Sequence, residues 1–107
     1  MAIIEKNTLE IIRQQIAKYP LILYMKGTPE EPRCGFSARV VEILISCGVK
    51  FAHVDVLEKT DIRHELPQFS NWPTFPQLYY KGELIGGCDI VEQLYKAGEL
   101  QKKIAET

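Results

Sequence analysis

A short, wholly apolar segment, Leu21–Met25, is the feature that most constrains how this chain can fold. Pro20 precedes it, and a polar loop with two prolines and a glycine follows it at residues 26–33. Neither of its alternating faces is polar, which is typical of a central strand buried on both sides, as in parallel sheets. We therefore expect a sheet with this segment inside it and helices that cover it.

The spacing of apolar residues predicts a helix before this strand and another after the loop. Thr8 is the expected N-cap of the first helix, which ends at Tyr19 because the residue before a proline avoids the helical region. The second helix begins near Cys34 and ends at Gly48. The expected apolar faces are Leu9, Ile12 and Ile16 in the first helix and Val40, Val41, Leu44 and Ile45 in the second.

Two strand patterns and a third helix occupy the next part of the chain. Residues 51–56 alternate enough in polarity to form a strand, and Thr60 or Asp61 starts a helix. The inward side chains of that helix are expected to be Ile62, Leu66 and Phe69. Gln77–Tyr80 and Glu83–Gly86 then have the pattern of two strands joined by a tight hairpin.

The remaining residues are predicted to be helical. Asp89 followed by Glu92 has the form of an N-cap with a reciprocal partner, although a plain ligand-facing Asp89 is equally consistent with the pattern. Gly98 ends this helix, and a short one starts at Glu99. The order predicts an α/β fold in one domain, residues 1–107, with a mixed four-stranded sheet flanked by about five helices.

The composition argues against several classes of protein. The 107 residues include 13 basic and 14 acidic side chains, a net charge of -1, without the positive excess that a nucleic-acid binder needs. The longest apolar run is far shorter than the roughly 20 residues that span a bilayer. The N-terminus lacks a secretory pattern, and three cysteines are an odd number. We expect free thiols in the cytoplasm, with no nucleic-acid or membrane partner.

Cys34 is the strongest candidate for chemistry because it lies where a strand leads through a loop into a helix. Unpaired N–H groups and the helix dipole stabilise a thiolate there, and such thiols have pKa values of about 3.5–7.5 instead of about 8.5. Lys26, at the other end of the loop, adds a positive charge. The position resembles a Cys-x-x-Cys redox site in which Ser37 replaces the second thiol. A mixed disulfide on Cys34 would therefore need an outside thiol to resolve it.

Two further motifs predict ligand contacts, one with an extended peptide and one with an anion. The bond between Phe75 and Pro76 is a candidate cis bond, and backbone fixed this way can pair with an extended peptide. Gly87 and Cys88 open a helix, whose N-terminus favours an anion. For Cys88 a packing role, a ligand contact and a second redox thiol all remain open, whereas Cys47 is expected to pack in the core.

Four motifs together resemble one family. They are Cys-Gly-Phe-Ser at 34–37, the Lys-Gly-Thr-Pro segment at 26–29, Trp-Pro-Thr-Phe-Pro at 72–76 and Gly-Gly-Cys-Asp at 86–89. In this order and spacing they resemble the monothiol glutaredoxins, and more narrowly the short, single-domain bacterial type. The resemblance runs from the first helix to the last. It implies a thioredoxin fold, with glutathione held in a groove beside the nucleophilic cysteine.

The resemblance also implies a role for individual residues. Lys26 and Arg63 are expected to meet the glycine carboxylate of glutathione. Thr74 and Phe75 are expected to pair with the main chain of its cysteinyl residue, and Cys88 and Asp89 to hold its γ-glutamyl end. The expected glutathione-binding residues are Lys26, Cys34, Phe36, Arg63, Thr74, Phe75, Pro76, Gly87, Cys88 and Asp89.

The resemblance further implies a [2Fe–2S] cluster, which normally takes four thiolates. One chain offers only Cys34, so two chains and two glutathiones complete the count in a homodimer. His53 and His64 are expected to be ordinary surface or strand histidines. The family implies transfer of the cluster to apo iron–sulfur client proteins and pairing with a BolA-type protein.

Two alternatives to this carrier function use the same thiol. One is a glutathione-dependent oxidoreductase that removes glutathione from mixed disulfides through Cys34. The other is a redox sensor in which Cys34 and Cys88 form a disulfide, which requires their Cα atoms to lie within about 7 Å. The carrier is favoured over the enzyme because Ser37 removes the resolving thiol and because the loop before Cys34 is longer than in dithiol relatives.

Overall fold

The computed structural model describes residues 2–105 of the chain, and the predicted order of elements is confirmed there. The elements are α1 (Ala2–Lys18), β1 (Leu21–Met25), α2 (Gly35–Ser46), β2 (Ala52–Asp55), α3 (Thr60–Ser70), β3 (Gln77–Tyr80), β4 (Glu83–Gly86), α4 (Cys88–Lys96) and α5 (Glu99–Ile104). Among the helices of these residues, none is both long enough and apolar enough to cross a membrane.

The four strands form the predicted mixed sheet, in the order β2-β1-β3-β4. β1 is parallel to β2 and antiparallel to β3, and β3 is antiparallel to β4. The hairpin between β3 and β4 turns at Lys81 and Gly82, whose φ values of 49 and 84 are both left-handed. Two left-handed residues in succession form the tight turn that matches the twist of a hairpin.

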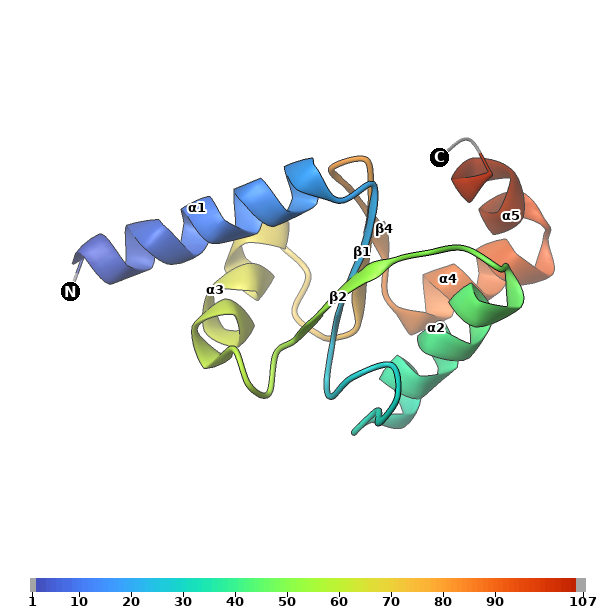
Figure 1. Ribbon diagram of the computed structural model, residues 1–107, viewed down its shortest axis with the longest axis horizontal. Helices are drawn as coiled ribbons and strands as arrows, with labels where there is room; N and C mark the ends of the chain where they lie inside the picture. Colours follow the sequence, from blue (N-terminus) through green and yellow to red (C-terminus); the bar gives the residue numbers. More distant parts are fainter. Residues whose placement is uncertain (1, 106–107) are drawn as a thin grey trace.

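Helices cover both faces of the sheet, with α1 and α3 on one face and α2, α4 and α5 on the other (Figure 1). β1 lies inside the sheet, and all five of its residues are buried. Leu21, Leu23 and Met25 pack in the cluster with α2, α4 and α5, whereas Ile22 and Tyr24 pack in the cluster with α1 and α3. This two-sided burial is why the strand has no polar face.

The strand directions bring several chain segments to one edge of the sheet. β1 and β2 both end at this edge, where Met25 pairs with Asp55. β3 runs the other way and begins there at Gln77, and β4 runs back and ends there at Gly86. The loop after β1, the segment before β3 and the start of α4 therefore lie at the same edge, although they are far apart in the sequence.

The prediction that Thr8 caps the first helix is wrong. α1 begins at Ala2, and no proline or glycine between residues 2 and 8 interrupts it. Thr8 is buried within the helix, and its hydroxyl donates to Asp61 Oδ2 at 3.1 Å. The side chain therefore links α1 to α3 instead of starting a helix.

Two predictions about helix faces and caps also need correction. The buried face of α2 is centred on Val40 and Leu44, and at about 100° per residue Ile45 lies beyond its edge. Ile45 is consequently 64% exposed, and Ile43 is buried in its place. Asp89 is not the cap of α4: Gly87 is the N-cap, and Asp89 lies in the first turn.

Candidate functional site

All ten residues predicted to bind glutathione line one pocket with a volume of about 540 Å³, at the sheet edge described above. The lining comes from the loop after β1, the start of α2, the outer side of α3, the segment before β3 and the start of α4. A pocket of this size suits a small-molecule ligand. The predicted residues in its lining are Lys26, Cys34, Phe36, Arg63, Thr74, Phe75, Pro76, Gly87, Cys88 and Asp89. That they bind glutathione stays a prediction.

Cys34 is the N-cap residue of α2, with an extended backbone (φ -150, ψ 135), and it is partly exposed in the pocket. Burial acts to raise the pKa of its thiol. Hydrogen bonds from the backbone of Ser37 and Phe36, the charge of Lys26 and the Ser37 hydroxyl outweigh this, so that the pKa lies below its ordinary value. Backbone N–H groups at a helix start stabilise a thiolate, as the sequence pattern predicts.

Ser37 occupies the position of the second cysteine of a dithiol site, but its side chain is buried and accepts a hydrogen bond. The Lys26 N–H donates to Ser37 Oγ at 3.1 Å. The same hydroxyl also contributes to the low pKa of Cys34. Ser37 therefore holds the start of the loop next to the thiol and supplies no second sulfur.

The segment before β3 supplies one wall of the pocket, and the predicted cis bond between Phe75 and Pro76 is confirmed. Buried Gln77 supports this wall from behind, because its Nε2 donates to the carbonyl oxygens of Trp72 at 3.0 Å and Thr74 at 3.2 Å. The Tyr79 hydroxyl in turn donates to Gln77 Oε1 at 3.0 Å. Gln77 was not among the residues predicted from the sequence. The signal that could have found it is an amide side chain at the start of a buried strand.

Trp72 closes the pocket toward α4, and it too was not among the predicted residues. Its Nε1 atom is buried without a hydrogen-bond partner within the described part of the chain. A Cβ atom added at Gly87 would lie 3.2 Å from Trp72 Nε1 and 3.2 Å from the carbonyl oxygen of Pro76. Gly87, at the start of α4, can therefore lie close to this wall because it has no side chain. Pro67 and Pro73 are the other lining residues that sequence analysis did not predict.

The thiol of Cys88 lies in the same pocket as Cys34 but in a different electrostatic environment. Burial and the negative charges of Glu92 and Asp89 hold the pKa of Cys88 above its ordinary value. Both cysteines, like Cys47, are free thiols. The disulfide considered from the sequence stays a prediction.

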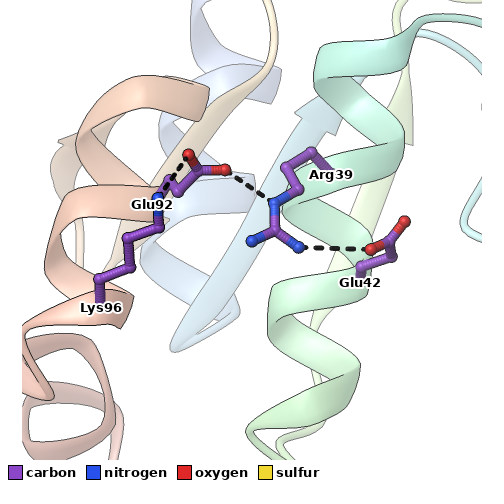
Figure 2. A network of polar contacts seen from close by, with 4 residues as sticks. All are labelled: Arg39, Glu42, Glu92 and Lys96. Atoms are coloured by element: carbon purple, nitrogen blue, oxygen red, sulfur yellow. Dashed lines mark hydrogen bonds and ion pairs between the residues drawn. The ribbon is translucent and has the colours of Figure 1, made fainter.

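An ion pair joins the two helices that begin at the pocket. Arg39 Nε on α2 lies 2.7 Å from Glu92 Oε2 on α4, and the network continues to Glu42 at 3.3 Å and to Lys96 at 3.4 Å (Figure 2). Glu92 therefore pairs across helices and is not the reciprocal partner of a cap at Asp89. Hydrogen bonds to Arg39 and the charge of Lys96 lower the pKa of Glu92.

The remaining candidate ligands lie outside the pocket lining. Cys47 packs partly buried against the core, as predicted. His53 on β2 and His64 on α3 are exposed. Among residues 7–105, whose side chains the structure describes, no group of three or more His, Cys, Asp and Glu side chains could bind a metal ion.

A family profile and curated relatives of known name match this chain, and they point to the same family. The glutaredoxin family profile matches residues 21–85. The chain is 59% identical over 101 residues to glutaredoxin 4 of Escherichia coli K12, covering 94% of this chain and 88% of that protein. It is 58% identical over 100 residues to glutaredoxin 4 of Haemophilus influenzae 86-028NP, with 94% of each covered.

Two solved structures resemble the fold closely. Reduced apo GrxS14 of poplar superposes with a TM-score of 0.77 at 46% identity, over 94% of this chain and 90% of that one. A buckwheat glutaredoxin in complex with glutathione superposes with a TM-score of 0.84 at 26% identity, over 95% and 91% of the two chains.

Proposed function

Because the chain belongs to the glutaredoxin family, as a monothiol glutaredoxin, we propose that its pocket binds glutathione and that Cys34 uses this glutathione to hold a [2Fe–2S] cluster. The observation that carries the proposal is the gathering of a low-pKa thiol with nine other expected contacts in one pocket. Two protomers share the cluster, which makes a homodimer. The cluster is cargo that the dimer passes to other proteins in iron–sulfur cluster biogenesis.

The pocket has the chemical groups that glutathione needs. Glutathione is a short peptide with a carboxylate at each end, and Lys26 and Arg63 provide cations for its glycine carboxylate. Thr74 and Phe75 provide main chain for the cysteinyl residue. The first turn of α4, at Cys88 and Asp89, receives the γ-glutamyl end. The buckwheat relative, which was solved with glutathione, supports this proposal.

The thiols of the chain fit a cluster shared between two protomers. A [2Fe–2S] cluster takes four ligands, for which thiolates are preferred. Cys34 is the cysteine whose pKa is lowered, whereas the pKa values of Cys47 and Cys88 are raised. One Cys34 from each protomer and one sulfur from each bound glutathione supply the four ligands. The carrier delivers to apo iron–sulfur proteins, pairs with a BolA-type protein and works in the cytoplasm.

The first test is anaerobic reconstitution with iron, sulfide and glutathione, followed by visible spectroscopy and size-exclusion mass. We expect a [2Fe–2S] spectrum on a dimer, and its loss when glutathione is omitted or in Cys34→Ser. Cys47→Ser is the matched control, because it removes a thiol outside the pocket and should leave the spectrum unchanged. A Cys34→Ser protein that still assembles the cluster would contradict the ligand assignment.

A glutathione-dependent oxidoreductase is the second candidate, and the lowered pKa of Cys34 is the observation that favours it. The Cys34 thiolate would attack the glutathione sulfur of a mixed disulfide and release the client thiolate. A second glutathione thiolate would then attack that sulfur, which yields glutathione disulfide and returns the Cys34 thiolate. A colourless monomer with robust turnover of a glutathionylated substrate would rank this function first. A sensor disulfide between Cys34 and Cys88 would form when an added oxidant takes two electrons and two protons from the two thiols, and the chain would lose the mass of two hydrogen atoms.

A further inference from the structure

The loop that joins β1 to α2 closes on itself and carries two groups of the pocket, Lys26 at its start and Cys34 at its end. The Arg33 N–H donates to the carbonyl oxygen of Lys26 at 2.9 Å, which brings the two ends of the loop together. Between them, the Glu31 N–H donates to the carbonyl oxygen of Thr28 at 3.0 Å, which closes a tight turn. The internal bonds define the shape of the loop but do not attach it to the rest of the molecule.

Two side chains outside the pocket lining attach this loop to the fold. Asp55, the last residue of β2, accepts the Gly27 N–H at 2.9 Å through Oδ1. The same oxygen accepts the Leu57 N–H at 2.9 Å, which fixes the carboxylate after the strand. On the other side, Ser37 accepts the Lys26 N–H at 3.1 Å. Consecutive backbone amides are thus held from β2 and from α2.

The backbone at Gly27 has little freedom to compensate for a lost anchor. Its φ of 92 is left-handed, and an added Cβ would lie 2.5 Å from the carbonyl oxygen of Glu31 and 2.7 Å from Arg33 N. The corner is therefore packed against the far side of its own loop. Movement of Gly27 would carry Lys26 and the segment before Cys34 with it.

We propose that Asp55 is a positioning residue for glutathione binding, although it does not line the pocket. Its carboxylate holds the Gly27 N–H, and through it places Lys26 and Cys34 toward the ligand. The inference rests on the proposed binding of glutathione and adds a residue that acts from behind the loop. A carboxylate accepting two backbone N–H groups is a strong anchor.

The test compares Asp55→Ala with Asp55→Asn, because asparagine keeps a carbonyl oxygen for the two N–H groups and alanine does not. Asp61→Ala is the matched control, since it also removes a carboxylate that accepts a hydrogen bond, here between α1 and α3. Two quantities are measured: the dissociation constant of reduced glutathione by calorimetry, and the rate of tryptic cleavage after Lys26 and Arg33.

We expect Asp55→Ala to raise the dissociation constant about tenfold, if the released loop keeps its binding arrangement for about a tenth of the time. Cleavage in the loop should accelerate in this variant. Asp55→Asn should restore both quantities nearly to those of the unmodified chain, and Asp61→Ala should change neither. An unchanged glutathione affinity in Asp55→Ala would overturn the proposal. So would a glutathione affinity of Asp55→Asn that is as low as that of Asp55→Ala.

The proposal remains testable if Asp55→Ala does not fold. The Gly27 amide of the unmodified chain should then exchange with deuterium slowly, and faster in Asp55→Asn, whose neutral acceptor is weaker. Exchange of the Gly27 amide at the rate of an open loop would overturn the anchor. Failure of the unmodified chain to bind glutathione would instead contradict the proposed function, while the cleavage and exchange rates would still report on the anchor.

Discussion

The thiols of the three cysteines differ in pKa because their surroundings differ. At Cys34, backbone hydrogen bonds at the start of α2 and the charge of Lys26 overcome the effect of burial and lower the pKa. At Cys88, burial and the carboxylates of Glu92 and Asp89 raise the pKa, and at Cys47 burial alone raises it. A residue type therefore does not by itself define a site; the charges and donors around it do.

We predict that iodoacetamide modifies Cys34 first at neutral pH, because the thiolate is the reactive form. Raising the pH should accelerate modification of Cys47 and Cys88 steeply, since both thiols are protonated below their raised pKa values. The rate at Cys34 should rise less, because a larger fraction of this thiol is already ionised. Peptide mass spectrometry after timed alkylation measures all three rates. Equal rates at Cys34 and Cys88 at neutral pH would contradict the prediction.

Gly87→Ala should distort the pocket, because the new Cβ would lie 3.2 Å from both Trp72 Nε1 and the carbonyl oxygen of Pro76. We expect a loss of about 1–3 kcal/mol in the free energy of unfolding, as for other overpacked sites. Glutathione binding should weaken as the start of α4 moves. Gly35→Ala is the matched control, because its Cβ would meet no atom within 4 Å. Denaturant titration measures the free energy of unfolding of both variants. Equal values would contradict the prediction that a Cβ atom at position 87 crowds its neighbours.

The pocket residues that could be predicted from the sequence are those for which the family resemblance implies a contact with the ligand. The ten expected residues belong to or accompany segments that resemble a known family, and all ten line the pocket. Gln77 and Asp55 lie outside the four motifs and act through hydrogen bonds to backbone groups, whereas Trp72 lies in the motif at 72–76 and packs against Gly87. The bond from Gly27 to Asp55 joins residues 28 positions apart, and it depends on the register of the sheet, which single-sequence patterns do not specify.

At the scale of elements, the strands were predicted more accurately than the helix ends. β1, β3 and β4 have their predicted bounds, because proline, glycine and polar turns delimit short apolar runs. The start of α1 was missed because Thr8, a good capping residue, instead bonds to Asp61 of α3. The cap of α4 was missed for a similar reason, since Glu92 pairs with Arg39 of α2. In both cases tertiary contacts overrode a local capping pattern.

The ion pair between α2 and α4 gives an element-scale prediction. Glu92→Gln removes the carboxylate that Arg39 and Lys96 contact (Figure 2), so it should lower stability modestly at neutral pH. The pKa of Glu92 is lowered in the folded chain, so the stabilisation is present above the unfolded pKa of this group. It is lost as the pH falls through the folded pKa.

The difference in stability between the original chain and Glu92→Gln should therefore vanish on acidification, and it should shrink in high salt because the pair is partly exposed. Urea unfolding midpoints across the pH range measure this difference. Glu42→Gln serves as a control, since Glu42 contacts Arg39 from the same helix and does not bridge to α4. A difference that persists at low pH would show that the effect comes from packing and not from charge.

At the scale of the whole molecule, sheet topology explains why distant segments form one pocket. The parallel β1 and β2 end where the antiparallel β3 begins and β4 ends. Lys26, Thr74 and Gly87 consequently face the same space, although Lys26 and Gly87 are 61 positions apart in the sequence. The order of elements could be predicted from polarity patterns, and right-handed crossover rules then restrict the arrangement.

Because the pocket joins segments from most of the chain, its ligand should stabilise the entire fold. A ligand that binds only the folded state, present at about 100 times its dissociation constant, adds about 2.7 kcal/mol to the free energy of unfolding. We therefore predict that reduced glutathione raises the melting temperature of the reduced chain in a concentration-dependent way. Differential scanning calorimetry measures the shift.

The dipeptide γ-glutamylcysteine tests the orientation of the ligand in the same experiment, because it lacks the glycine carboxylate. It should stabilise the original chain less than glutathione does, since Lys26 and Arg63 lose their expected partner. Arg63→Gln should then narrow the difference between the melting-temperature shifts that the two ligands produce, because one of the two cations is gone. Lys59→Gln is the matched control, as it removes a cation that lies outside the pocket lining. Equal stabilisation of the original chain by both ligands would mean that these cations do not hold the glycine end, and the ligand would then have to lie in another orientation.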